Sequence, residues 1–133
     1  MKGAPLLDTH TWVWWIDRKP QLAPATIERL EALPPEDRPY LADVSLWEVV
    51  MLTERGRLKL EIPVGQWLAD ASHPRAVRVV PIFAAIAAET QVARALRDPA
   101  DRLIVATSRI LGVPLFTNDR NILRSRLVER WVP

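Results

Sequence analysis

The chain has no cysteine among its 133 residues. Disulfide bonds and cysteine-based zinc sites are therefore excluded, and the absence fits a reducing cytosol. No apolar run is long enough to cross a membrane, and the first apolar stretch ends at Asp8, before the core of a signal peptide could form. We expect a cytoplasmic protein with no membrane segment.

Linkers, internal repeats and low-complexity segments are also missing. With 49% hydrophobic and 26% charged residues, the composition is close to the average of soluble globular proteins, which excludes the disordered and fibrous classes. A chain of 133 residues can bury a core and falls within the usual size of one domain. We expect a single domain over residues 1–133.

The charge is mildly basic, with a net charge of +2 and a pI near 9.5. Of the 18 positive residues, 15 are arginine, whose planar guanidinium can donate two hydrogen bonds to one phosphate. The arginines are scattered, however, and scattered charges do not form a patch. A GC-rich genome is the simpler explanation of their number.

Predicted strands and helices alternate along the chain. The strands are expected at residues 4–7, 40–42, 77–80 and 113–117, with a fifth at an edge over 128–132. The helices are expected at residues 9–17, 24–33, 46–55, 64–71, 83–96 and 99–111. This alternation predicts an α/β fold, a three-layer sandwich in which helices flank a mostly parallel central sheet.

Four acidic residues stand where such a fold places its ligands. Asp8 and Asp119 follow predicted strands, whereas Glu48 and Asp101 lie in the first turns of predicted helices. Ligands of open parallel sheets bind beyond the carboxyl ends of the strands, so the four carboxylates are expected at one rim. At that proximity they would stay partly protonated unless a cation neutralised them.

A divalent metal ion fits this arrangement. Oxygen ligands without cysteine favour Mg²⁺ or Mn²⁺ over zinc. One such ion, or two, can activate a water molecule and stabilise the leaving oxygen of a phosphate ester. The implied reaction is phosphodiester hydrolysis.

Each acid also has a purely structural explanation. Ser45 and Glu48 match a capping box, and Asp98 with Asp101 suits the start of a helix. Asp8 could cap the next helix, and Asp119 could belong to a plain turn. Only the joint occurrence of all the acids favours a metal site.

Three segments carry a family resemblance. They read "LLDTHTWVWW", "VSLWEVVMLTERGRLKL" and "RDPADRLIVATSRILGVPLFTND". In order and spacing they resemble the PIN-domain ribonucleases, specifically the VapC-like toxins of bacterial toxin–antitoxin pairs. The resemblance extends from Leu6 to the region of Trp131.

The resemblance implies a site and a reaction. Asp8, Glu48, Asp101 and Asp119 match the four family acids, which hold Mg²⁺ or Mn²⁺ and activate water against an RNA phosphodiester. Thr117 matches a small hydroxyl residue that helps to orient the metal site. Two further acids are possible assistants or structural residues, namely Asp98, which could only cap its helix, and Asp43, for which an ordinary strand-end role is favoured.

The resemblance also implies partners. A VapB-like antitoxin and a homodimer are expected, and the run "WVWW" at residues 12–15 is the candidate for partner contact. His10 is expected to be structural rather than a general base. Apart from the resemblance, we expect arginines beside the acids, such as Arg102 and Arg120, or others around the rim, to hold flanking RNA phosphates.

Two other classes of function stay open. A haloacid-dehalogenase-like phosphatase would use Asp8 as its nucleophile, but that class requires a second aspartate two residues later, where this chain has His10. A catalytically inactive PIN-fold module that binds RNA or protein would keep the fold without the chemistry. The presence of all four acids favours the nuclease.

Overall fold

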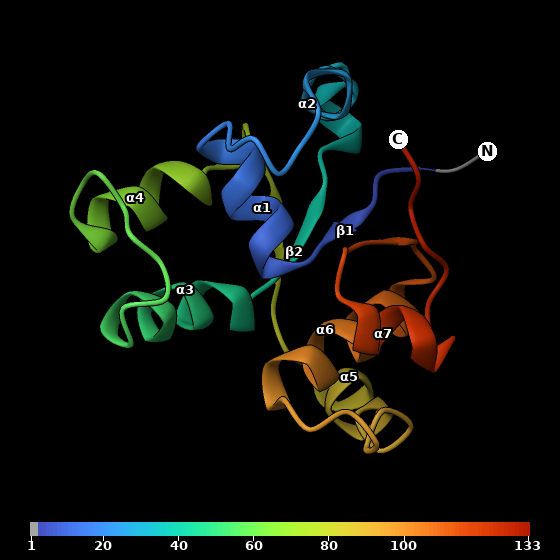
Figure 1. Cartoon of the computed structure of the whole chain (residues 1–133). Coiled ribbons are helices and arrows are strands. Elements are labelled where there is room, and N and C mark those ends of the chain that lie inside the picture. Colours follow the sequence, from blue (N-terminus) through green and yellow to red (C-terminus); the bar gives the residue numbers. More distant parts are fainter. Residues whose placement is uncertain (1–2) are drawn as a thin grey trace.

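The computed structural model describes residues 3–133 and has a four-stranded sheet at its centre (Figure 1). All strand pairs are parallel, and the spatial order is β3-β2-β1-β4. The strands are β1 (Leu6–Leu7), β2 (Tyr40–Ala42), β3 (Arg78–Val80) and β4 (Leu115–Phe116). Because every strand runs in the same direction, their carboxyl ends lie at one edge.

Within residues 3–133, seven helices and one short 3₁₀ turn connect and cover the strands. They are α1 (Thr9–Ile16), α2 (Pro24–Glu31), η1 (Pro35–Asp37), α3 (Val44–Glu54), α4 (Val64–Ala71), α5 (Ala84–Glu89), α6 (Pro99–Leu111) and α7 (Arg120–Ser125). The longest, α6, has clear local signals. Asp98 caps its first turn, Pro99 occupies the first helical position, and Gly112 ends it with a φ of +67°.

The two faces of the sheet build two separate cores. Leu7, Leu41 and Phe116 point into a core shared with α1, α2, α3 and α4. Their neighbours Leu6 and Leu115 point the other way, into a core with α6 and α7. Figure 1 shows α1, α2 and α4 on one side of the sheet and α5, α6 and α7 on the other. The predicted three-layer α/β fold is therefore confirmed.

The structure differs from the sequence prediction at three elements. The expected fifth strand is wrong, because residues 128–132 make only an isolated bridge between Leu115 and Arg130. The helix predicted over 83–96 ends at Glu89, and the residues after it form turns. There Thr90 bonds the Ala87 carbonyl through its side chain, which competes with the helix backbone. Helix α7 was not predicted.

No helix within residues 3–133 is long and apolar enough to span a bilayer. The longest, α6, has 13 residues, whereas a spanning helix needs about 20.

Candidate active site

Asp8 begins the site at the carboxyl end of β1. It is only 6% exposed, and its backbone amide donates to the Phe116 carbonyl of β4 at 3.0 Å. One carboxylate oxygen accepts from the Thr9 amide at 2.7 Å, which caps α1. The other accepts from the Thr117 hydroxyl at 2.6 Å. Asp8 is therefore a helix cap whose carboxylate is also fixed by the neighbouring strand end.

Thr117 connects Asp8 to Asp119. Thr117 is fully buried after β4, and its hydroxyl oxygen accepts from the Asp119 amide at 3.0 Å while donating to Asp8. Asp119 in turn caps α7, because its Oδ1 accepts from the amides of Asn121 and Ile122 at 2.8 and 3.1 Å. One oxygen of Asp119 is committed to this cap, and the other makes no hydrogen bond with the described residues.

Glu48 reaches the same rim from α3. The Thr9 hydroxyl donates to Glu48 Oε1 at 2.5 Å, and the same hydroxyl lies 2.8 Å from Ser45 Oγ. Because the Thr9 proton goes to Glu48, Ser45 donates to Thr9. The capping-box explanation of Ser45 and Glu48 is wrong. Helix α3 starts at Val44, so Ser45 lies inside the helix and Glu48 bonds to α1 instead of its own amides.

Two acids of α6 complete the cluster. Asp98 Oδ1 accepts from the Ala100 amide at 2.8 Å, as a helix cap does. Asp101 follows in the first turn of the helix. Glu48, Asp98 and Asp101 each offer a carboxylate oxygen, and these three oxygens lie within 4.8 Å of one another. Residues from α3 and α6 that are about 50 positions apart in sequence thus form one oxygen-lined site.

Burial and repulsion from neighbouring acids both affect the protonation of Asp101. Its pKa is raised from 3.8 to about 8. Burial is the largest cause, and the negative charges of Asp98, Asp8, Asp119 and Glu48 add to it in that order. The other four carboxylates are therefore all close enough to act on Asp101. A cation bound among them would remove the repulsion.

Burial also raises the pKa of Asp8 and of Glu48, and hydrogen bonds oppose that effect. For Asp8 the opposing donors are the Thr117 hydroxyl and the Thr9 amide, and for Glu48 the donor is the Thr9 hydroxyl. Each of these donors favours the charged carboxylate. The buried hydroxyls of Thr9 and Thr117 thus stabilise the ionised carboxylates at this rim.

A pocket of about 590 Å³ opens directly beside the acids. Its lining includes Asp98, Asp101 and Asp119, and it also includes Arg97 and Arg124. Neither arginine was singled out from the sequence. Arg97 immediately precedes an acid and could have been found by that adjacency, but Arg124 lies in the unpredicted helix α7.

The two arginines that were predicted to hold phosphate lie elsewhere. Arg102 is half-buried and donates from Nη2 to the Thr90 carbonyl at 3.2 Å. Arg120 is exposed at the start of α7 and is not among the residues lining this pocket. Helical geometry explains the difference, because residues next to each other on a helix point in different directions.

The remaining polar candidates have structural contacts. His10 is exposed, and its ring centroid lies 5.9 Å from that of Trp14. Asp43 Oδ2 accepts from the Ile82 amide at 3.1 Å, which ties the end of β2 to the segment after β3. Asp43 Oδ1 is buried without a hydrogen bond to any described residue.

The tryptophan run mainly builds the core. Trp12 is fully buried and donates from Nε1 to the Ala71 carbonyl at 3.0 Å. It also packs edge-on against Trp67, with ring centroids 4.9 Å apart. Trp14 is half-buried, and Trp15 is 5% exposed. Only Trp14 and the edge of Trp15 can therefore take part in a contact with a partner.

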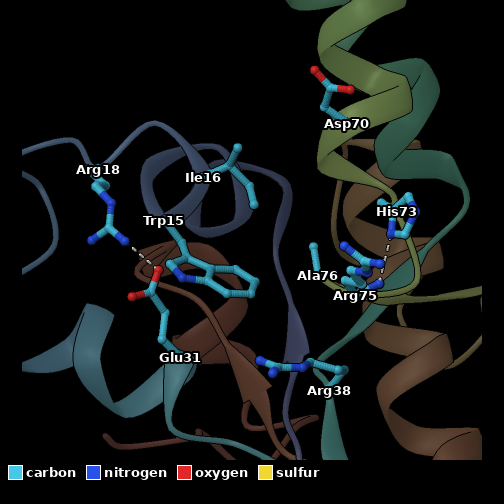
Figure 2. Close-up of a pocket in the computed structure, with 9 residues that line it drawn as sticks. All are labelled: Trp15, Ile16, Arg18, Glu31, Arg38, Asp70, His73, Arg75 and Ala76. Atoms are coloured by element: carbon cyan, nitrogen blue, oxygen red, sulfur yellow. Dashed lines mark hydrogen bonds and ion pairs between the residues drawn. The ribbon is translucent and has the colours of Figure 1, made fainter. Parts of the chain in front are cut away.

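Trp15 lines a second pocket, of about 520 Å³, at the carboxyl end of α1 (Figure 2). Helix α1 starts at the acids, so this pocket lies at the far end of that helix. Figure 2 shows the ion pair between the Arg18 guanidinium and the Glu31 carboxylate at one side of the pocket, at 2.7 Å. Arg38 and Arg75 line the opposite side. The pocket is thus polar and mixed in charge, with an aromatic floor.

Comparisons with known proteins agree with this architecture. Residues 6–126 match the family model described as PIN domain. The chain is also 37% identical over 122 residues to Ribonuclease VapC22 of Mycobacterium tuberculosis, and the match covers 91% of each protein.

Proposed function

Because the chain belongs to the PIN-domain family and is similar to a VapC ribonuclease over 91% of its length, we propose that it is an endoribonuclease toxin. The observation that carries the proposal is the meeting of Glu48, Asp98 and Asp101 within 4.8 Å, next to buried Asp8. The substrate is RNA, and the bond that is hydrolysed is the phosphodiester. An RNA substrate makes the cytoplasm the proposed place of action.

The donor set fits Mg²⁺ or Mn²⁺. The acids supply only oxygen atoms, and burial together with the surrounding negative charges raises the pKa of Asp101. We assign Asp8, Glu48, Asp101 and Asp119 as the ligands, with Asp98 as an additional one. Mg²⁺ or Mn²⁺ bound there would activate water and stabilise the leaving oxygen.

The residues of the chain prepare this site before any substrate enters. Thr117 holds Asp8, and Thr9 holds Glu48, each through a hydroxyl that donates to the carboxylate. Asp119 is held by the amides at the start of α7. With these side chains fixed in advance, little reorganisation is needed when the phosphate arrives.

The test is cleavage of mixed cellular RNA by purified, partner-free protein. Assays contain Mg²⁺, Mn²⁺ or EDTA, and Asp101→Asn is the matched control because it keeps the size of the side chain. Cleavage that requires metal and is lost in the variant supports the proposal. No cleavage by folded protein, together with retained RNA binding, would favour the inactive binding module instead. A phospho-aspartyl intermediate at Asp8 would favour the phosphatase.

We also propose a VapB-like antitoxin as partner, docked at the pocket shown in Figure 2. Trp15 lines this pocket as an apolar surface, and the half-buried Arg38 and exposed Arg75 side chains lie around it, which suits a peptide with apolar and acidic residues. Arg75→Glu should weaken binding of the co-expressed antitoxin in calorimetry. Unchanged affinity would exclude the pocket as the docking site.

A homodimer is proposed from exposed apolar side chains. Trp47 is 57% exposed, and Ile82 and Phe83 are each 45% exposed. Ile82 is tied to Asp43 at the start of α3, one turn before Trp47, so these groups lie in one region. Sedimentation velocity of the wild type and of Trp47→Ser tests this, with a monomeric wild type as the contradicting result.

A further inference from the structure

The pocket beside the acids is lined by side chains of both charges. Its lining includes the carboxylates of Asp98, Asp101 and Asp119 and the guanidinium groups of Arg97 and Arg124. The arginines come from different elements, one preceding α6 and one in the last turn of α7. A pocket lined by both acids and arginines can hold a metal-bound phosphate and a second, free phosphate at the same time.

Arg97 and Arg124 are available for a ligand. Both are exposed, and neither makes a hydrogen bond or ion pair with any residue from 3 to 133. Two other arginines of the same layer are already engaged. Arg102 donates to the Thr90 carbonyl, and Arg109 pairs with Glu89 at 2.7 Å. Within the described part of the chain, Arg97 and Arg124 are thus unpaired cations that line the same pocket as the acids.

The chemistry of the substrate requires such cations. The phosphate that is cleaved would have its charge balanced at the metal site, but its neighbours along the RNA keep their full charge. Next to a cluster of carboxylates an unbalanced phosphate is repelled. An arginine fork offers two parallel hydrogen bonds and a permanent positive charge, which overcomes that repulsion.

We propose that Arg97 and Arg124 hold the RNA phosphate next to the one that is cleaved, and thereby set how the strand enters the site. This inference rests on the proposed ribonuclease function. The pocket volume of about 590 Å³ exceeds what a phosphate needs, so the attached nucleoside enters as well. Asn121 lines the same pocket, and only its backbone amide is engaged, by Asp119. Its free side-chain amide pairs with a base edge.

The test measures RNA binding without cleavage. All proteins carry Asp101→Asn, and the probe is a fluorescein-labelled single-stranded 12-nucleotide RNA of random sequence in Mg²⁺. Arg97→Ala/Arg124→Ala is compared with Arg29→Ala/Arg57→Ala, which removes the same charge from exposed positions in α2 and after α3. Figure 1 shows α2 far from α6 and α7. Thermal unfolding of each protein verifies that it is folded.

The double substitution Arg97→Ala/Arg124→Ala should raise the Kd for RNA about tenfold at moderate salt. The slope of log affinity against log salt should become shallower by about 0.7, since each phosphate contact on a single strand contributes about 0.7 and the two arginines hold one phosphate. The Kd of the Arg29→Ala/Arg57→Ala control should stay within about twofold of that of the Asp101→Asn parent. Equal effects in both pairs, or no RNA binding by the parent, would overturn the inference.

Failure of the inference is distinct from failure of the proposed function. If protein with native Asp101 cleaves RNA with metal but the two arginine pairs behave alike, only the assignment of Arg97 and Arg124 is wrong. If that protein cleaves no RNA, the ribonuclease proposal itself fails. A single Asn121→Ala variant then separates base contact from phosphate contact, because it should change the preferred cleavage sites without changing the salt slope.

Discussion

At the scale of single residues, two threonines fix the carboxylates of the site in position. Thr9 and Thr117 are fully buried, and each donates its hydroxyl hydrogen to a carboxylate of the site. Groups that orient metal ligands commonly contribute 10–100-fold to metal affinity or activity, as an order of magnitude. Thr9 is the more informative of the two, because it joins α1 to Glu48 of α3 and is itself held by Ser45.

Replacing Thr9 with valine should therefore lower kcat and Mn²⁺ affinity by roughly 10–100-fold. Thr9→Ser keeps the hydroxyl and should restore most of both. The control is Thr107→Val in α6, which removes a buried hydroxyl bonded only to the Leu103 carbonyl. Both valine variants should lose about 1–2 kcal/mol of stability. A control that loses as much Mn²⁺ affinity as Thr9→Val would reduce Thr9 to a structural residue.

Asp101 makes the stability of the metal-free protein depend on pH. Its pKa is about 8 in the folded state and 3.8 without the fold. Between these values the folded protein keeps a proton that the unfolded chain has released. The free energy of unfolding therefore falls as pH rises, and the loss is complete above about pH 8.

Asp101→Asn cannot ionise, so it should flatten this decline. In EDTA at pH 8 its unfolding midpoint should exceed that of the wild type by roughly 2–8 °C, whereas at pH 4 the two should nearly coincide. Adding Mg²⁺ at pH 8 should stabilise the wild type more than the variant. Differential scanning calorimetry at several pH values measures these differences. Parallel curves for the two proteins would contradict the role given to Asp101.

The residues of the site were predictable because they follow recognisable signals. Asp8 and Asp119 follow strands, and Asp101 lies in the first turn of a helix that starts with Asp98 and Pro99. Their supporting hydrogen bonds were not predictable. The bond from Thr9 to Glu48 joins positions 39 residues apart, and no local pattern encodes such a distance. Arg124 was missed for the same reason, since its place in the pocket depends on tertiary packing.

At the scale of elements, the ends of helices explain which predictions succeeded. Helix α6 was predicted at residues 99–111 and is found there, because a cap, a proline and a left-handed glycine mark both ends. Helix α7 has only six residues and one buried apolar side chain, Ile122, so it lacks a periodic pattern. The segment after α5 is apolar enough for a helix, yet it turns so that Ala93 and Leu96 pack beside α6.

Substitution of two glycines by alanine should change the stability of the protein in opposite directions. Gly112 ends α6 with a φ of +67°, whereas Gly65 lies inside α4 without a positive φ. An added Cβ meets nothing within 4 Å at either position, so only backbone preference decides. Gly112→Ala should cost about 1 kcal/mol, and Gly65→Ala should gain about 0.5–1 kcal/mol. Urea unfolding measures both, and RNA cleavage should stay unchanged; stabilisation by Gly112→Ala would be the contradicting result.

At the scale of the whole molecule, the site lies where the two layers meet. Asp8 follows a strand shared by both cores, Glu48 comes from α3, and Asp98 and Asp101 come from α6 on the other face. The acids can converge only while both layers are packed on one sheet. We therefore propose that the chain folds as a single unit, and that loosening either layer disperses the site.

The distribution of tryptophan allows a direct test of this unity. Five of the six tryptophans belong to the core under α1–α4 or pack against it, so near-UV circular dichroism reports on that layer. Ile104→Val alters the opposite core, where Ile104 is fully buried, and should cost about 0.5–1.5 kcal/mol. If the chain unfolds as a single unit, the thermal midpoints measured by near-UV and by far-UV circular dichroism both fall by the same few degrees. Independent layers would leave the tryptophan signal at its wild-type midpoint, because nothing in its own core has changed.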